Sequence, residues 1–520
     1  MDSGGTVPPS EVGAAIQSAL AQEDWDEVMS LIERNWSVLL AQEMPLLTEV
    51  LGSAPEHIRH GQPRWAIAAG YLGLLAQGSA SPTLYRDVVS RPRAGRTLLD
   101  MLSELTSRSA GRRAVGDFSE AVDAARRAQG LLAAAADEQR VQLKYALPHL
   151  LLQLARSFEL AGNERPALVT YAEVYDLGRV IDDDHLASQA AGRIAWIHAV
   201  AGRRSLAERW LLRTETRHPM PDRLRTGEYL SRALLAVDVL NFEASRTLLE
   251  KVLSDVDSES WAEILLVRAV LARPEDGDQL VQAVEEAAVV LPAGLVSSGA
   301  NADCLAIVIV IARERQSQQV RGALDLRRYE IGPSTAVTTL AHAYADASQG
   351  DRSASIKKAR FAMRSSSGHP RWSIAASLLL HVLGDVSDTE LRSTVATAIE
   401  KGQLRALNII PAPELSALGL PHQVLKSLLM VPISQGLNPT LALSKRERQV
   451  FQHLSLGVST DEIATFLYIS PNTVKTHLKS IYRKLGIQRR DQAILLAREL
   501  GLELVQNEGT EYSDSDTRVT

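Results

Sequence analysis

Cysteine, aromatic residues and long apolar runs are all scarce in this sequence. The single cysteine, Cys304, rules out an internal disulfide and a thiolate metal site, and we expect a buried, unreactive thiol there. No apolar run reaches the roughly 18 residues of a membrane-spanning helix. The first residues, MDSGGTVPPSEVG, have neither the basic nor the apolar region of a signal peptide. We therefore expect a cytoplasmic protein with no membrane partner.

Patterns typical of β-strands are equally scarce. Aromatic residues make up 5% of the chain, and few stretches alternate Val, Ile or Thr with polar residues. Ala and Leu instead recur at the i, i+3, i+4 and i+7 spacing of an amphipathic helix. The run CLAIVIVIA at 304–312 could form a buried strand, but a helix is favoured because its neighbours are helical. With 45% hydrophobic and 23% charged residues, the chain is predicted to be globular and all-α.

Positive charge is concentrated near the C-terminus. The whole chain has a net charge of −6, whereas residues 441–505 contain ten Lys or Arg and six Asp or Glu, a net charge of +4. An acidic body with a basic terminal segment suggests that this segment binds a polyanion. Charge alone is weak support, because a local excess is more often a solvated surface.

Short turn segments repeat along the body of the chain. They read GDFSEAV, GNERPAL, GRRSLAE, GDRSASI and NFEASRT, and they begin at Gly116, Gly162, Gly202, Gly350 and Asn241. In three of them an alanine follows the glycine by five residues, at Ala121, Ala167 and Ala207. Glycine tolerates the positive φ of a helix C-terminus, and a small residue lets two helices approach closely. Each segment therefore predicts the turn of a helical hairpin.

A second repeat supports a solenoid of such hairpins. The segments QPRWAIAAG and HPRWSIAAS, around Trp65 and Trp372, match in register, and both are expected to open a helix at Pro63 and Pro370. The hairpins resemble tetratricopeptide repeats, most closely in LLQLARSFELAGNERPALVTYAEVY. Such a solenoid would offer a concave face to a peptide, protein or small-molecule effector. The expected organisation is a flexible N-terminus at 1–11, repeats at 12–407, a Pro-containing linker at 408–440, a separate basic domain at 441–504 and an acidic disordered tail at 505–520.

Capping signals divide the segment from Leu443 onward into four helices. Ser444 with Glu447, and Ser459 with Glu462, form two capping boxes. Ser470 is an N-cap, and the proline after it fits the first helical position of a third helix. A fourth helix is expected from about residue 490.

The third of these helices has one apolar face and one basic face. Val474, Leu478, Ile481 and Leu485 share the side expected to pack on Ile463, Ala464 and Leu467. Lys475, Thr476 and Lys479 must then point outward. Two lysines around a small residue suit a helix in the major groove, where lysine reaches phosphates or guanine and threonine meets base edges.

These residues resemble the DNA-binding domain of LuxR/FixJ/NarL-type regulators over about 62 residues. The matching elements are Leu443–Glu447, Glu462–Ala464, Ile469–Ser470, Thr473–His477 and Lys484–Leu485, with the helix-turn-helix at 459–478. The resemblance implies base or groove contacts by Lys475 and Thr476, backbone contacts by Lys479 and Lys484, and a place for Ser470 and Thr473 in the interface. It implies structural roles for Arg446 and Glu447 and a packed or backbone-contacting ring for His477. The repeats ahead of this domain also resemble the C-terminal half of MalT-like regulators.

The sequence therefore predicts a bacterial, sequence-specific transcriptional regulator, with activation as the family expectation. Its expected partners are double-stranded DNA, a second copy of the chain and an effector on the repeats, with RNA polymerase as a further candidate. A repeat scaffold that uses the terminal domain only as an anchor is the alternative. No phosphate-binding loop, nucleophile elbow or zinc motif occurs, and Asp182–His185 is interpreted as a solvated turn, so no enzyme activity, metal or cofactor is expected.

Overall fold

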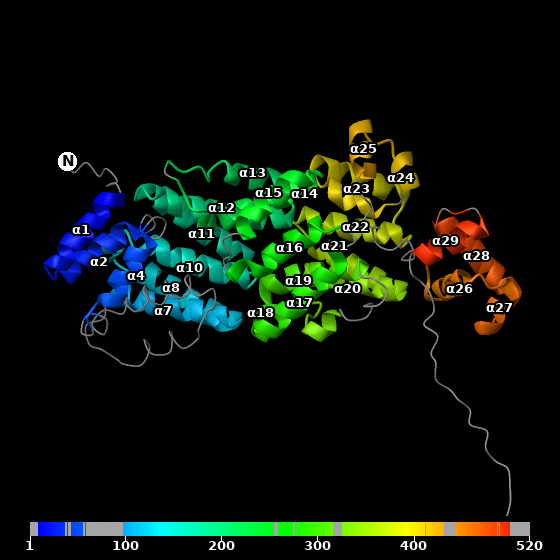
Figure 1. Cartoon of the computed structure of the whole chain (residues 1–520), viewed down its shortest axis with the longest axis horizontal. Coiled ribbons are helices and arrows are strands. Elements are labelled where there is room, and N and C mark those ends of the chain that lie inside the picture. Colours follow the sequence, from blue (N-terminus) through cyan, green and yellow to red (C-terminus); the bar gives the residue numbers. More distant parts are fainter. Residues whose placement is uncertain are drawn as a thin grey trace, which may run out of the picture.

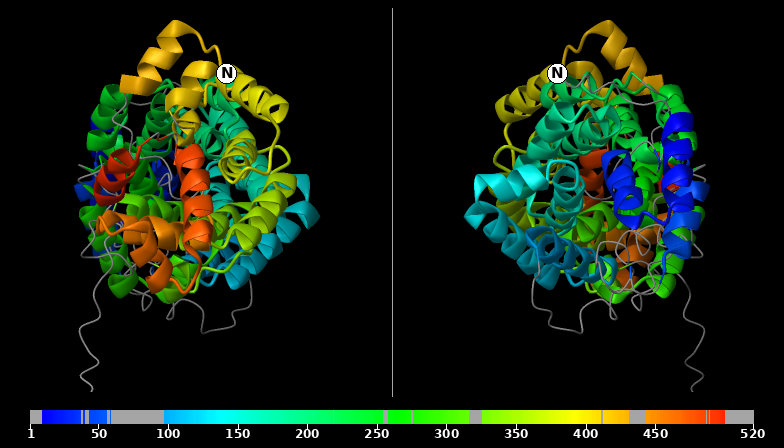
Figure 2. Two further views of the ribbon diagram at one scale, coloured as in Figure 1. Left: turned by 90° about the vertical axis from the view of Figure 1, so that its right-hand side faces the viewer. Right: turned by 90° about the vertical axis from the view of Figure 1, so that its left-hand side faces the viewer.

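The computed structural model describes most of the chain. The described residues are 9–36, 39, 43–55, 58, 97–217, 219–253, 258–273, 276–315, 325–410, 412–430, 443–485, 487 and 489–499. Every regular element among them is a helix, so the predicted all-α fold is confirmed. The helices form an elongated body, with the N-terminal helices at one end and residues 443–499 at the other (Figure 1; Figure 2). No helix within these ranges is long and apolar enough to cross a membrane.

Among the described residues before residue 55, three helices share one small apolar cluster. They are α1 (Pro9–Ala21), α2 (Trp25–Arg34) and α4 (Met44–Ser53). Helix α1 already begins at Pro9, where a proline in the first turn is tolerated because its N–H would have no helical partner. The N-terminal segment expected to be flexible, 1–11, therefore overlaps α1 from Pro9 onward. The predicted helix start at Pro63 and the expected tail at 505–520 lie outside the described residues.

The repeated turn segments do join helical hairpins. The pairs are α7 (Leu98–Ala114) with α8 (Phe118–Ala134), α10 (Leu147–Leu160) with α11 (Glu164–Val180), α12 (Asp184–Ala201) with α13 (Arg204–Leu211), α14 (Thr226–Asp238) with α15 (Phe242–Leu253), and α20 (Ala336–Gln349) with α21 (Arg352–Ser365). The four turn glycines all have positive φ, at 79°, 78°, 80° and 83°. Ala121, Ala167 and Ala207 are completely buried, as their small size predicted.

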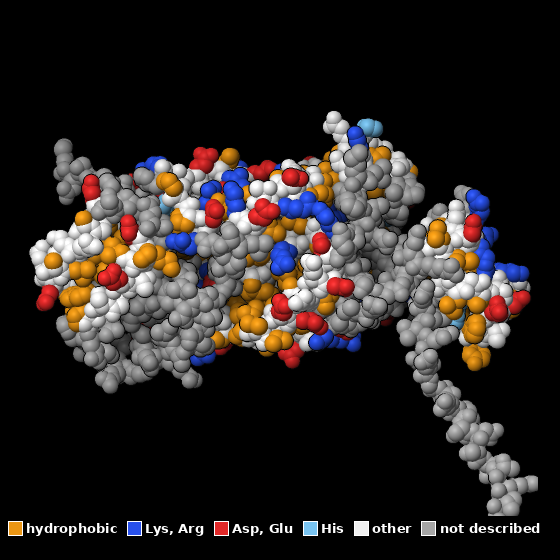
Figure 3. Space-filling view, viewed as in Figure 1, with side chains coloured by type: hydrophobic (Ala, Val, Ile, Leu, Met, Phe, Trp, Pro, Cys, Tyr) orange, Lys and Arg blue, Asp and Glu red, His pale blue; other side chains and the backbone are white. Residues whose placement is uncertain are grey.

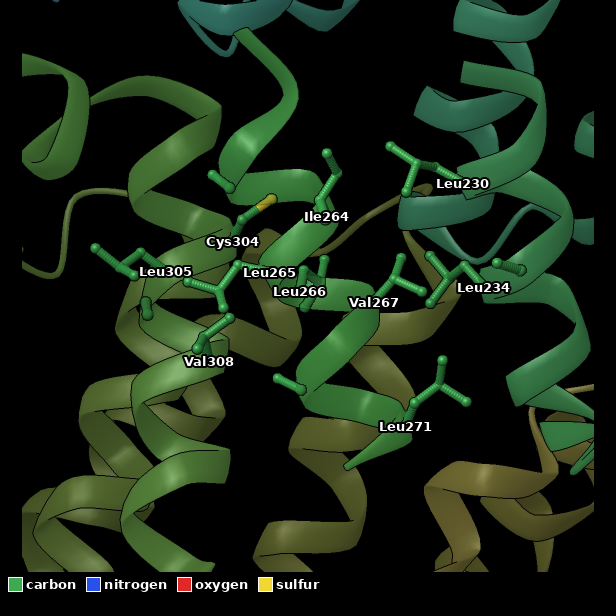
Figure 4. Close-up of a cluster of buried hydrophobic side chains, with 14 of the residues drawn as sticks. Leu230, Leu234, Ile264, Leu265, Leu266, Val267, Leu271, Cys304, Leu305 and Val308 are labelled. Carbon is green, nitrogen blue, oxygen red and sulfur yellow. The ribbon is translucent and has the colours of Figure 1, made fainter. Parts of the chain in front are cut away.

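The other helices fill the space around these hairpins. They are α9 (Asp137–Gln142), η1 (Asp222–Arg225), η2 (Ser258–Ser260), α16 (Trp261–Leu271), α17 (Gly277–Val290), α18 (Ala293–Ser297), α19 (Gly299–Arg315), η5 (Leu326–Tyr329), α22 (Pro370–Val382), α23 (Asp388–Glu400), η6 (Leu404–Ile409), α24 (Ala412–Ala417) and α25 (His422–Met430). The apolar run at 304–312 lies inside α19, so the helical interpretation is confirmed. It packs on α16, which also contacts α14 (Figure 4). Burial raises the pKa of the Cys304 thiol in this core well above its ordinary value.

The segment expected to be a linker contains packed helices in its first part. Leu407, Leu415 and Leu428 are buried in one apolar cluster with residues of α22 and α23. Pro413 and Pro421 do not prevent this, because Pro413 is the second residue of α24 and Pro421 directly precedes α25, positions that need no backbone N–H. Within 408–440, residues 431–440 lie outside the described part.

A buried network of charges joins the hairpins to α16. Arg193 of α12 donates to both Glu159 of α10 and Glu263 of α16, with Nε 3.1 Å from Glu159 Oε2 and Nη1 3.0 Å from Glu263 Oε2. Arg156 of α10 lies 3.0 Å from the same two carboxylates. Burial alone would raise the pKa of Glu263, but the two guanidinium groups hold it at about 2. The tyrosine hydroxyl of Tyr171 donates to Glu159 at 2.6 Å. Buried charges are stable only when they are paired in this way.

This network connects the first helices of three hairpins to a later segment of the chain. Arg113, Arg156 and Arg193 come from α7, α10 and α12, the first helices of three successive hairpins. All three reach Glu259 in η2 or Glu263 in the first turn of α16. Arginine side chains of these three helices therefore contact Glu259 and Glu263 of the same chain.

The acidic segment Asp182–His185 is only partly a solvated turn. Asp182 is exposed in the turn with φ 63°, and the Asp183 side chain caps α12 by accepting from Leu186 N. Asp184 and His185 are buried, at 9% and 1% exposure, because they form the first turn of α12. The Asp184 carboxylate accepts from the backbone N–H of Arg217 at 2.6 Å. No group of His, Cys, Asp or Glu suited to a metal ion occurs among the described residues.

One arginine links the C-terminal hairpins to α12 across more than 170 residues of sequence. Arg371, at the start of α22, donates to the carbonyls of Ala199 and Val200 at 2.9 and 3.0 Å. These carbonyls end α12, three and two residues before Gly202. The same guanidinium forms a two-pronged ion pair with buried Asp238 of α14, both distances being 2.7 Å.

We predict that Arg371→Ala destabilises this junction by roughly 3–5 kcal/mol, because it leaves the Asp238 carboxylate buried without its main partner. Hydrogen exchange of peptides from α12 and α22 in the full chain measures the loss. Lys401→Ala is the control, because Lys401 pairs only with exposed Glu400. Equal exchange in wild type and R371A would contradict the prediction.

Candidate nucleic-acid interface

Four helices form a separate apolar cluster at the C-terminal end. They are α26 (Lys445–Ser455), α27 (Thr460–Phe466), α28 (Pro471–Leu485) and α29 (Arg490–Glu499). The predicted core residues meet in this cluster, which includes Phe451, Ile463, Ala464, Leu467, Val474, Leu478, Ile481, Ala493 and Ala497. Leu485 lies at its margin and is half-buried. A small, tightly packed core thus fixes how α27 and α28 lie relative to each other.

Side-chain caps begin the first three helices of this cluster. Ser444 with Glu447, and Ser459 with Glu462, form the two predicted capping boxes. Hydrogen bonds from the Ser459 hydroxyl and N–H lower the pKa of Glu462. The Ser470 hydroxyl accepts from Thr473 N at 3.1 Å, which caps α28. These local bonds satisfy N–H groups that the first turn of a helix leaves without partners.

The connection between α27 and α28 is held by backbone and arginine hydrogen bonds. Tyr468 N donates to Thr465 O at 3.2 Å, and Ile469 N donates to Ala464 O at 3.0 Å. Arg446 of α26 donates to the carbonyl of Leu467 and, at 2.9 Å, to Gln449. Arg446 therefore fixes the turn between two other helices, a role that its position beside Glu447 did not reveal.

The outward face of α28 is basic and exposed. Lys475, Thr476 and Lys479 are exposed, as are Ser470 and Thr473 at the start of the helix. Arg483 is also exposed and continues the i, i+4, i+8 line of Lys475 and Lys479. Sequence reasoning missed Arg483, although this spacing could have identified it. Lysine and arginine side chains gather on the edge of the cluster that faces away from the body (Figure 3).

Two further positions predicted from the sequence are Lys484 and His477. Lys484 lies in α28, but its side chain is outside the described part of the structure. His477 is half-buried next to Leu478. On α29, Ala493 and Ala497 face the core, whereas Leu495 is 59% exposed.

One arginine of α26 connects this cluster to the body. Arg448 donates to the carbonyl of Ala347 at 2.9 Å and to that of Ser348. These carbonyls end α20, three and two residues before Gly350, which is the relation that Ala199 and Val200 have to Gly202. Burial, together with the positive charge of neighbouring Arg313, lowers the pKa of Arg448 to about 10.

Comparison with known proteins adds an independent finding for the same residues. Residues 441–497 match the family described as "Bacterial regulatory proteins, luxR family". The spore germination protein GerE of Bacillus subtilis (strain 168) is 44% identical over 63 residues, which are 12% of this chain and 85% of that protein. The CsgBAC operon transcriptional regulatory protein of Escherichia coli (strain K12) is 42% identical over 57 residues, 11% of this chain and 26% of that protein.

A larger relative matches over a similar stretch. The HTH-type transcriptional regulator MalT of Serratia proteamaculans (strain 568) is 38% identical over 73 residues, 14% of this chain and 8% of that protein. The chain thus spans about a quarter of the length of the CsgBAC regulator that it matches and nearly all of GerE. The similarity concerns the C-terminal cluster.

We predict that Ser470→Ala lowers the stability of this cluster by about 1 kcal/mol, because it removes the acceptor that caps α28. Ser470→Asn should restore most of the loss, since asparagine is an equally good N-cap. Hydrogen exchange of peptides covering 470–485 measures both changes. If S470A exchanged no faster than wild type, the cap would not limit the stability of α28.

Proposed function

This chain belongs to the LuxR family of bacterial regulatory proteins, and we propose that residues 441–504 bind promoter DNA in a sequence-specific way. The single observation that carries the proposal is the exposed basic face of α28, held in place by the core of the cluster. In a helix-turn-helix, the second helix enters the major groove and its N-terminal residues meet base edges. Here Lys475 and Thr476 would contact bases, whereas Lys479, Arg483 and Lys484 would contact the backbone.

We propose that the protein binds DNA as a dimer. Two recognition helices about 34 Å apart would then lie in successive major grooves. Exposed Leu495 on α29 supports this arrangement, because it offers an apolar contact to a second copy. RNA polymerase would be the further partner if the protein activates transcription.

The body would regulate this module through the Arg448 contact. Arg448 donates hydrogen bonds to carbonyls at the end of a helix, as Arg371 does within the body. The module therefore contacts the body in the same way as one helix of the solenoid contacts another. The exposed basic face stays free in the docked position. Docking would therefore set the orientation of the module, and an effector or partner on the body would change that orientation.

Changing Lys475 and Lys479 to Ala should abolish specific binding. The first step is selection of bound fragments from random DNA with the full chain, from which we expect an inverted-repeat site. Fluorescence anisotropy on that site across a salt series should show affinity falling as salt rises. Each phosphate contact removed should reduce the slope of log K against log salt by about 0.9.

The matched control removes the same charge elsewhere. Arg126 and Arg127 are exposed on α8, and their double alanine variant should bind like wild type. If the wild-type chain enriched no site even at low salt, or if K475A/K479A bound the site normally, the proposal would be wrong. Partner capture by the body without DNA binding would then favour the repeat scaffold.

Arg448→Ala should release the module from the body. Loss of two hydrogen bonds corresponds to roughly tenfold more of the undocked state. We therefore expect thermolysin to cut the segment 431–442 about tenfold faster than in wild type. Arg489→Ala, which removes an exposed arginine from the same module, is the control. Equal cleavage of R448A and wild type would show that this contact does not hold the module.

A further inference from the structure

Tyr468 occupies a helix-terminal position that usually belongs to glycine. Its φ is 53°, in the left-handed region that a residue with a Cβ rarely adopts. The hydrogen bonds from Tyr468 N to Thr465 O and from Ile469 N to Ala464 O form the motif that ends a helix with one left-handed residue. Glycine satisfies this motif without steric cost, whereas tyrosine does not.

The first turn of the same module shows the usual solution. Gly457, after α26, has φ 76°, and its N–H bonds to Leu454 O at 2.9 Å. The turns after α7, α10, α12 and α20 also place glycine at a positive φ. The turn before the recognition helix differs from the first turn of the module, as does the turn after α14 in the body, where Leu240 has φ 65°.

Packing does not explain the tyrosine. Tyr468 is 95% exposed, the highest value among the exposed large apolar side chains of the described residues. Leu467 and Ile469, on either side of it, supply the contacts of this turn with the core. The ring of Phe466 stacks on His453, with centroids 5.2 Å apart, and no stacking or cation–π contact of Tyr468 is found in the described part of the chain. A side chain that strains the backbone and adds no packing calls for a functional explanation.

The position of the turn indicates what this side chain can reach. Tyr468 lies two residues before Ser470, the cap of α28. When α28 lies in the major groove, its N-terminal end meets the bases and α27 crosses the backbone. The connection between the two helices then lies beside one DNA strand, and an exposed side chain there projects toward sugar and phosphate.

We propose that Tyr468 is a DNA-backbone contact that positions the recognition helix. Its hydroxyl would donate a hydrogen bond to a phosphate oxygen, and its ring would cover the adjacent sugar. Tyrosine is among the side chains that make such contacts, which fix register without reading sequence. This inference rests on the proposed DNA binding and adds a residue outside the basic face of α28.

The contact has a signature that separates it from a lysine contact. A neutral hydroxyl neutralises no phosphate charge, so it contributes affinity without releasing counterions. Removing it should weaken binding by the same factor at every salt concentration. Removing Lys479 should instead reduce the salt slope.

The test uses the full chain and the enriched DNA site. Tyr468→Phe keeps the ring and the backbone conformation but removes the hydroxyl, and we expect affinity to fall about three- to tenfold with an unchanged salt slope. Tyr468→Gly removes the whole contact and relieves the backbone. It should bind at least as weakly as Y468F, while hydrogen exchange of peptides from 459–485 becomes no faster.

Glu330→Gly is the matched control for the backbone change. Glu330 also has a left-handed φ, 56°, but it follows η5 in the body, so its replacement should leave DNA affinity unchanged. Normal binding by Y468F would overturn the hydroxyl contact, and normal binding by both Tyr468 variants would overturn the inference while DNA binding by the wild type stands. If the wild type itself bound no DNA, both proposals would fall.

Discussion

The buried ion network between α10, α12 and α16 constrains the rest of the body. Arg156 and Arg193 lie beside Glu159 and Glu263. Each of these buried charges would be unstable without its partners of opposite charge. The carboxylate of Glu263 must therefore stay in place, and with it the start of α16. Helix α16 in turn packs on α19 and contributes to the largest apolar cluster of the described residues.

Arginines that bind helix C-termini extend this body in two steps. Arg371 ties α22 to the end of α12, and Arg448 ties the DNA-binding module to the end of α20. Both sites offer carbonyls three and two residues before a left-handed glycine, and the first of each pair also accepts the N–H of that glycine. The turn of the repeat thus has two uses: it reverses the chain, and it provides an acceptor for an arginine from elsewhere. This gives the proposed regulation a physical basis, since one side chain joins the body and the module.

The DNA-binding module depends more on local chemistry. Serine caps begin α26, α27 and α28, and the alternation of apolar and basic positions along α28 assigns its two faces. Its basic face is exposed because its apolar face packs in the core of the module. Tyr468 departs from this local consistency, because it adopts a left-handed conformation that the turn after α26 assigns to Gly457. Departures of this kind are expected where function, rather than stability, selects the residue.

The sequence by itself determined the helical class, the hairpin turns at the repeated glycines, and the caps and faces of the C-terminal module. Those features arise from interactions between residues a few positions apart, which a sequence displays directly. Only the tertiary structure decided that Glu259 and Glu263 pair with arginines of three hairpins, that η6, α24 and α25 pack as helices, and that Asp184 and His185 are buried. Contacts such as Arg113 with Glu259 and Arg371 with Ala199 join residues more than 140 positions apart. No local period records such partners, because they depend on how complete hairpins stack in space.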